Sequence, residues 1–195
     1  MGLHKISDYR KQRGVSENFN NYIHEIGFRN IIAHPEYSCS KVANDIALLE
    51  LQQPIEFNKF IQPICVATKN ANSHNFGYQA VVSGWGWTNE NQNIGIRADV
   101  LQKATVDVWN NNDCQKSFRQ FNAKSIITSK QMCAGKVTGG IDSCWADSGG
   151  PLVTHENVLI GVVSTGIGCA RSGLPGIYTR VSEYADWIEN IIAKN

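Results

Sequence analysis

Short apolar runs separated by turn-forming residues are the feature that most constrains the fold of this chain. Six runs have the composition and length of β-strands and few segments show helical spacing, so the chain is expected to be an antiparallel sandwich or barrel. The turn between the fourth and fifth runs is expected at residues 154–157. The six predicted strands are residues 46–51, 79–83, 100–108, 151–153, 158–164 and 177–181.

The C-terminal segment differs from the rest of the chain. Its apolar residues fall at helical spacing, which predicts one surface helix that packs an apolar face. Ser182 is the expected N-cap of this helix, and residues 89–93 and 110–112 are expected to be polar loops. The apolar residues are Tyr184, Trp187, Ile188, Ile191 and Ile192.

Charge and hydropathy exclude several function classes. The net charge of +1 comes without a basic or acidic block, so we expect neither a nucleic-acid partner nor an anionic membrane surface. No apolar run approaches the roughly 18 residues of a membrane span. Residues 1–13 lack an apolar core, so no signal peptide is expected within the chain. The 195 residues suit one domain.

The six cysteines are widely spaced and form no CxxC pair. This argues against a zinc site or a thioredoxin-like motif, so neither a metal nor a cofactor is predicted. Widely spaced cysteines in a loop-rich chain indicate disulfides and an oxidising compartment. Spacing alone leaves the pairing open.

Ser148 lies between Asp147 and the pair Gly149-Gly150, just before an apolar strand. This pattern suits an exposed, reactive hydroxyl on a tight turn, although the same residues also occur in ordinary turns. Acyl transfer by serine needs a base, a carboxylate that orients the base, and donors for the oxyanion. Asp45 opens the apolar strand 46–51 and is the candidate carboxylate; its alternative role is that of a turn or cap residue.

These motifs resemble the trypsin/chymotrypsin family of serine proteases. The resemblance implies an all-β fold of two antiparallel Greek-key β-barrels, the N-terminal one incomplete, with a C-terminal α-helix. It identifies residues 1–195 as a serine protease domain that lacks its N-terminal portion. The matching segments are 44–49 (aspartate motif), 84–86 (glycine–tryptophan–glycine), 132–135, 141–151 (nucleophile loop), 175–181 and 184–188.

The resemblance assigns the catalytic roles position by position. Asp45 and Ser148 match the catalytic aspartate and serine, and Ser164 matches the serine beside that aspartate. The amides of Ala146 and Ser148 match the oxyanion hole. Asp147 matches the acid that receives the new amino terminus after zymogen cleavage.

The resemblance also assigns the specificity pocket. Asp142 matches the residue at its base, and Gly166 and Gly176 match the glycines that keep it open. A carboxylate buried there selects a Lys or Arg side chain, because an unpaired buried charge is costly. The alternative for Asp142 is a solvated loop acid.

Family cysteine positions imply the disulfides Cys114–Cys133 and Cys144–Cys169. Cys65 matches the cysteine that tethers the catalytic domain to an upstream pro-region in many multidomain relatives. Cys39 has no family partner, and its loop is expected to lie far from Cys65.

The chain departs from the family pattern at several positions. The catalytic histidine is absent, because residues 2–5 resemble the strand that follows its segment. Ala146 replaces a glycine of the oxyanion hole, Trp145 beside it would crowd the pocket rim, and Thr165 replaces a tryptophan of the cleft. Leu3 replaces an acidic calcium ligand, so calcium is not expected. The five histidines are expected to be exposed or structural; they are His4, His24, His34, His74 and His155.

The sequence thus predicts a secreted or extracellular serine endopeptidase that cleaves after Lys or Arg and is activated from a zymogen. This chain is expected to be inactive as given, since loss of the histidine alone lowers kcat by about 10⁶. Protein or peptide substrates and macromolecular inhibitors are the implied partners. The main alternative is a non-catalytic homologue that acts as a binding or regulatory module. A purely structural β-domain would leave Asp142 and the Ser148 motif unexplained.

Overall fold

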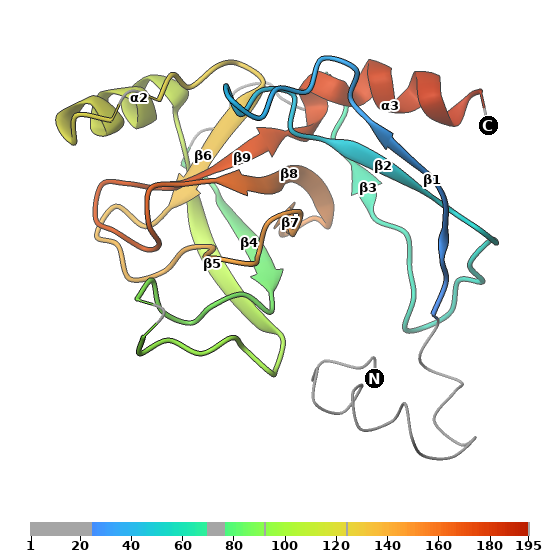
Figure 1. Cartoon of the computed structure of the whole chain (residues 1–195), viewed down its shortest axis with the longest axis horizontal. Coiled ribbons are helices and arrows are strands. Elements are labelled where there is room, and N and C mark those ends of the chain that lie inside the picture. The colour runs from blue at the N-terminus through green and yellow to red at the C-terminus, as the bar shows by residue number, and fades with distance from the viewer. Residues whose placement is uncertain (1–24, 70–76, 92, 124, 195) are drawn as a thin grey trace.

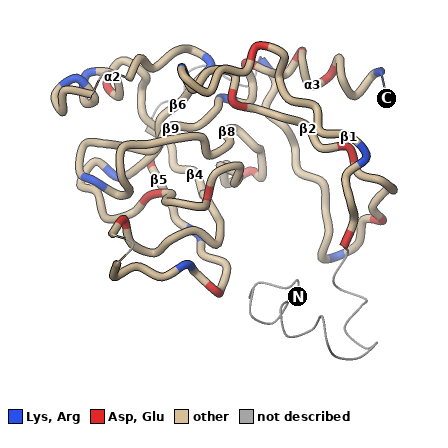
Figure 2. Tube along the Cα trace, viewed as in Figure 1, with Lys and Arg blue, Asp and Glu red and all other residues tan. Residues whose placement is uncertain are grey.

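The computed structural model describes residues 25–69, 77–91, 93–123 and 125–194. The expectations for Leu3, His4, His24 and His74, and for the segment 2–5, lie outside these residues. Figure 2 shows Lys and Arg interspersed with Asp and Glu along the described chain.

A closed six-stranded barrel forms the C-terminal part of the molecule (Figure 1). Its strand order is β8-β7-β4-β5-β6-β9, every neighbouring pair is antiparallel, and a β8–β9 pairing closes the ring. The order β7-β4-β5-β6 is that of a Greek key. The six strands are β4 (Gln79–Gly84), β5 (Gln102–Trp109), β6 (Gln131–Gly135), β7 (Pro151–Thr154), β8 (Val158–Thr165) and β9 (Gly176–Arg180).

A second, two-stranded antiparallel sheet lies beside the barrel (Figure 1). It pairs β1 (Phe28–Ala33) with β2 (Ala47–Leu51), and a short strand, β3 (Cys65–Val66), runs parallel to β8 on the outside of the barrel ring. The expected all-β architecture with a C-terminal helix is confirmed. Among the described residues, the part of the chain before β4 contributes this two-stranded sheet and β3.

Residues at alternate positions along the barrel strands point inward and form the main core. Ala80 and Val82 of β4, and Val106 and Val108 of β5, are buried at every second position, as expected when one face of a sheet packs inward. Tyr178 of β9 is fully buried in the same cluster. The six strands predicted from the sequence are all present, and the β7–β8 pair turns at 154–157 as expected.

The C-terminal helix α3 (Ala185–Ile192) begins later than the Ser182 prediction implied. A 3-10 turn, η3 (Val181–Tyr184), precedes it, and the N-cap residue Tyr184 makes no side-chain capping bond. The Ser182 prediction was wrong because this side chain is buried inside the turn. Among the described residues its hydroxyl has no hydrogen-bond partner. Tyr184 and Ile188 pack with Leu48 of β2, which holds the helix against both sheets.

The polar loop predicted at 110–112 was also wrong. Asn110 caps a helix, α2 (Asn111–Gln120), because its side chain accepts a hydrogen bond from the Asn112 amide. Asn is among the preferred N-cap residues. Cys114 and Phe118 lie one turn apart on this helix and are fully buried.

Candidate active site

The loop that carries Ser148 is a tight turn before β7, and Ser148 is exposed on it. The Asp147 amide donates to the Cys144 carbonyl at 3.0 Å, and the Gly150 amide donates to the Asp147 carbonyl at 2.8 Å. Gly149 has φ +82° and donates its amide to Val163 of β8. The glycine is needed here because a side chain disfavours this conformation.

Ala146, which replaces a glycine of the family pattern, has φ +69° and so adopts the left-handed conformation. An L-residue pays about 1–2 kcal/mol for this conformation. Among the described residues, the amides of Ala146 and Ser148 have no acceptor within the protein. Both therefore remain able to donate to an oxyanion.

Asp45 lies in the connection between β1 and β2 and is held by the barrel. Ser164 Oγ of β8 donates to Asp45 Oδ2 at 2.7 Å, and Thr179 Oγ1 of β9 donates to the Asp45 carbonyl at 2.7 Å. Asn44 beside it has φ +52° and accepts from Lys130 Nζ at 2.8 Å. Ser164 thus contacts Asp45, as does Thr179, which sequence reasoning missed.

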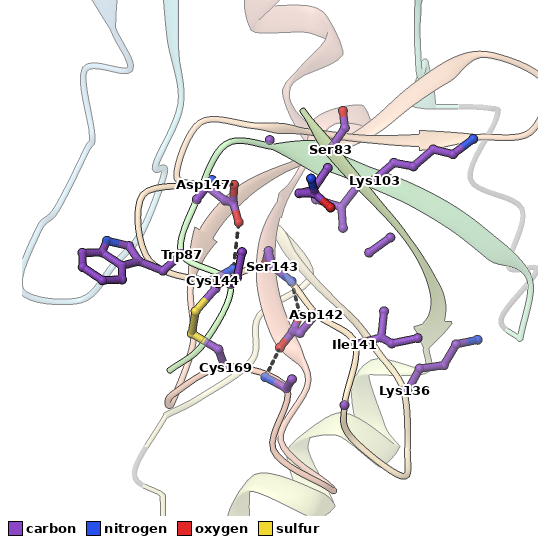
Figure 3. Close-up of a pocket in the computed structure, with 18 of the residues that line it drawn as sticks. Ser83, Trp87, Lys103, Lys136, Ile141, Asp142, Ser143, Cys144, Asp147 and Cys169 are labelled. Atoms are coloured by element: carbon purple, nitrogen blue, oxygen red, sulfur yellow. Dashed lines mark hydrogen bonds between the residues drawn. A yellow bond between two sulfur atoms is a disulfide. The ribbon is translucent and has the colours of Figure 1, made fainter. Parts of the chain in front are cut away.

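Asp142 lies on the wall of a cavity of about 1070 Å³ (Figure 3). Its Oδ1 accepts the Ser143 amide at 2.8 Å and its Oδ2 accepts the Ala170 amide at 3.3 Å. Burial raises the pKa of Asp142 to about 6; these amides and that of Gly176 oppose the shift, and the charge of Asp147 adds to it. Asp142 is thus half-buried, with two backbone amides on its carboxylate.

Two glycines meet beside the Asp142 carboxylate. A Cβ on Gly176 would lie 2.9 Å from Asp142 Oδ1, so β9 can approach the carboxylate only without a side chain there. A Cβ on Gly166 would lie 3.9 Å from the Cα of Gly176, so the two glycines face each other. Sequence reasoning missed the polar contact next to them, in which Tyr178 Oη and Ser143 Oγ lie 3.2 Å apart.

The Asp147 carboxylate lines the same cavity (Figure 3). It accepts the Gly86 amide at 2.8 Å and the Cys144 amide at 3.0 Å. A Cβ on Gly84 or Gly86 would overlap the carboxylate. The glycine–tryptophan–glycine segment therefore makes room for Asp147, a function that its sequence alone did not indicate.

Both predicted disulfides are present: Cys114 pairs with Cys133 and Cys144 pairs with Cys169. The second one joins the Ser148 loop to the segment after β8. Cys39 and Cys65 are unpaired and exposed.

Neither histidine in the described part of the chain reaches the site. His34 packs its ring against Tyr184 and Trp187, with centroid distances of 5.4 and 5.1 Å, and His155 lies in the β7–β8 turn. Neither forms a hydrogen bond with Ser148 or Asp45. Trp145 and Thr165 are both exposed.

The described residues contain no group of three or more His, Cys, Asp or Glu placed to hold a metal ion. Within the same residues, no helix combines the length and the apolar character needed to span a membrane.

Comparisons with known proteins agree with this geometry. A family model described as Trypsin matches residues 7–188. The chain is 39% identical over 170 residues to transmembrane protease serine 9 of Rattus norvegicus, covering 84% of this chain and 15% of that protein. It is 39% identical over 168 residues to serine proteinase stubble of Drosophila melanogaster, covering 84% and 21%. It is 40% identical over 166 residues to trypsin 5G1 of Aedes aegypti, covering 85% and 59%. The chain thus spans less than two thirds of each relative.

Proposed function

This chain belongs to the trypsin family of serine proteases, and we propose that it is the part of a serine endopeptidase domain that selects Lys or Arg at the cleavage site. Ser148 is the proposed nucleophile, and Asp45 the carboxylate that would orient the base. Ser164, Gly166 and Gly176 belong to the proposed substrate site.

The observation that carries the specificity is the Asp142 carboxylate. It is largely buried, it faces a cavity, and its hydrogen-bond donors are neutral backbone amides. A buried carboxylate without a cationic partner favours a ligand that brings the positive charge, because an uncompensated buried charge is costly. The ammonium of Lys or the guanidinium of Arg supplies this charge.

The proposed chemistry follows from the positions of the site residues. Ser148 Oγ would attack the carbonyl carbon of the scissile bond, its proton passing to a base, while the carbonyl oxygen accepts from the amides of Ala146 and Ser148. Asp147 fixes the shape of this loop through Gly86 and Cys144. As the acid that receives a new amino terminus, it would link the loop to zymogen activation.

The proton acceptor is the group that the described site does not supply. Without a histidine, kcat falls by about 10⁶, or about 8 kcal/mol of activation free energy. We therefore propose that residues 1–195 alone have little peptidase activity. An active protease built on this site needs a histidine delivered beside Asp45 and Ser148.

A non-catalytic binding module is the second candidate function. The left-handed conformation of Ala146 and the exposed Thr165 in place of a cleft tryptophan favour it. In this alternative the Asp142 cavity would still bind a cationic side chain, but no acyl-enzyme would form in any longer version of the protein.

Two measurements on the oxidised chain test the proposal. Calorimetric titration with blocked peptides that differ at one residue should give saturable binding for Arg and Lys and none for Leu or Glu. Equal affinity for all four peptides would contradict Lys/Arg selection. A fluorophosphonate should label Ser148 no faster than a surface serine, and rapid stoichiometric labelling would refute the claim of inactivity.

The proposed setting is secreted or extracellular, because two disulfides persist in oxidising compartments. Protein or peptide substrates and macromolecular inhibitors are the proposed partners. Cys65 is exposed and unpaired, which suits the proposed disulfide tether to a pro-region.

A further inference from the structure

An ion pair links two loops that are distant in sequence. Arg171 Nε donates to Glu90 Oε2 at 2.9 Å, and Arg171 Nη2 donates to the other carboxylate oxygen, so the pair is bidentate. The pKa of Glu90 is lowered, chiefly by its hydrogen bond with Arg171 and to a smaller extent by the nearby Cys169 backbone, while burial opposes the shift.

The Ala170 amide, next to Arg171 in the chain, faces a different carboxylate. The Cys169 backbone lies near Glu90, whereas the Ala170 amide donates to Asp142 Oδ2 at 3.3 Å. The segment 168–171 is therefore held between Glu90 on one side and the base of the proposed specificity pocket on the other. The Cys144–Cys169 disulfide and a 2.8 Å bond from the Gly140 amide to the Ala170 carbonyl complete its attachments.

Gly168 shows that the backbone leaves room for this ion pair. It has φ +72°, and a Cβ at this position would overlap both Arg171 Nε and Glu90 Oε1. A side chain at residue 168 would therefore displace the pair. The glycine, the guanidinium and the carboxylate form one packed unit at the edge of the cavity, which Glu90 and Arg171 both line.

We propose that the Glu90–Arg171 pair is a positioning element for the specificity pocket: it fixes the Cys169–Ala170 peptide so that the Ala170 amide holds Asp142 ready for a cationic side chain. The inference rests on the proposed function, since it takes Asp142 as the receiver of Lys or Arg. Neither residue of the pair touches that side chain. They act through the Cys169–Ala170 peptide.

The pair should influence binding more than overall stability. The side chains of Arg171 and Glu90 are 50% and 30% exposed, and exposed ion pairs contribute little to folding. Loosening the peptide removes one donor from Asp142, so the pKa of Asp142 rises further. Asp147 and the phenol of Tyr178 are the titratable groups that act on Asp142 from neighbouring elements, and neither contacts the pair directly.

The test is calorimetric titration of the full oxidised chain with benzamidine, an aromatic amidinium, between pH 5 and 9. Glu90→Gln and Arg171→Gln should each weaken binding about 3- to 10-fold, the size of effect seen along coupled networks. The double variant should equal either single variant, because both remove one interaction. The pH midpoint of binding should move upward in all three. Glu50→Gln breaks the comparable Arg29–Glu50 pair on the second sheet and should change neither quantity.

Amide hydrogen exchange gives a readout that does not need the probe. The Ala170 amide should exchange faster in Glu90→Gln than in the wild type or Glu50→Gln under native conditions. Wild-type affinity, pH midpoint and exchange in Glu90→Gln would overturn the inference while leaving the proposed function intact. If the wild-type chain fails to bind benzamidine, or Asp142→Asn binds it equally well, the proposed function fails and the inference fails with it.

Discussion

Ser164 Oγ donates a 2.7 Å hydrogen bond to Asp45 Oδ2, although the two residues are 119 positions apart. Ser164 belongs to the barrel and Asp45 to the connection within the second sheet, so this bond fixes the proposed catalytic carboxylate relative to the loop that carries Ser148. Thr179 reinforces it by donating to the backbone carbonyl of Asp45.

Thr179→Val should destabilise the fold by about 1–3 kcal/mol, because the shape is kept while the Asp45 carbonyl loses a buried donor. Urea unfolding measures the change. Ser172→Ala, which removes an exposed hydroxyl-to-carbonyl bond to Val137, is the control and should have a much smaller effect. Equal losses in the two variants would contradict a structural role for the Thr179–Asp45 bond.

Asp142 should make stability depend on pH. Its pKa rises from 3.8 to about 6 on folding, mainly through burial. At Asp142 the folded state therefore binds more protons than the unfolded state between these values, so the contribution of this residue to stability falls as pH rises from about 4 to 6 and is constant above. Asp142→Asn should remove this slope and stabilise the chain at pH 8 by up to about 3 kcal/mol. Thermal unfolding across pH measures both effects, and an unchanged slope would contradict the burial of this carboxylate.

Ala146→Gly should stabilise the chain by up to about 1 kcal/mol, since relief of the left-handed strain exceeds the entropy cost of glycine. The melting temperature reports the gain. Ala193→Gly at the end of α3, where φ is −69°, supplies the control and should show no gain. A loss of stability in Ala146→Gly would mean that the alanine side chain contributes contacts that outweigh the strain.

Cys39 and Cys65 should react with a thiol reagent in the unreduced native chain, because both are exposed and unpaired. The four cysteines in the two disulfides should not react. Peptide mapping after alkylation identifies the modified positions. A Cys39–Cys65 bridge would contradict the separation expected for their loops.

The part of the fold that could be predicted from the sequence is the part encoded by regular local patterns. Alternation and strand-length apolar runs indicate the barrel strands, as in β4 and β8. The helix α2 was not predicted from the sequence. Its first residues indicate a loop in the sequence because Asn serves both turns and N-caps, and only the bond between Asn110 and Asn112 separates the two. Ser182 failed as a cap because η3 intervenes before α3.

The candidate site also combines residues in local motifs with contacts between distant segments. Asp45, Asp142 and Ser148 stand in local motifs that a sequence can show. The contacts that support the site are not visible in local motifs. Thr179 contacts Asp45 across 134 positions, and Glu90 contacts Arg171 across 81. Such contacts depend on how the barrel closes, which no local pattern encodes.

The most direct test of the central claim compares benzamidine binding by the wild-type chain and by Asp142→Asn at pH 8. Wild type should bind saturably, and the variant should bind at least about 100-fold more weakly, because a desolvated cation loses its carboxylate partner. Equal affinities, in a variant that unfolds as cooperatively as the wild type, would show that Asp142 is not the base of a Lys/Arg-selective pocket.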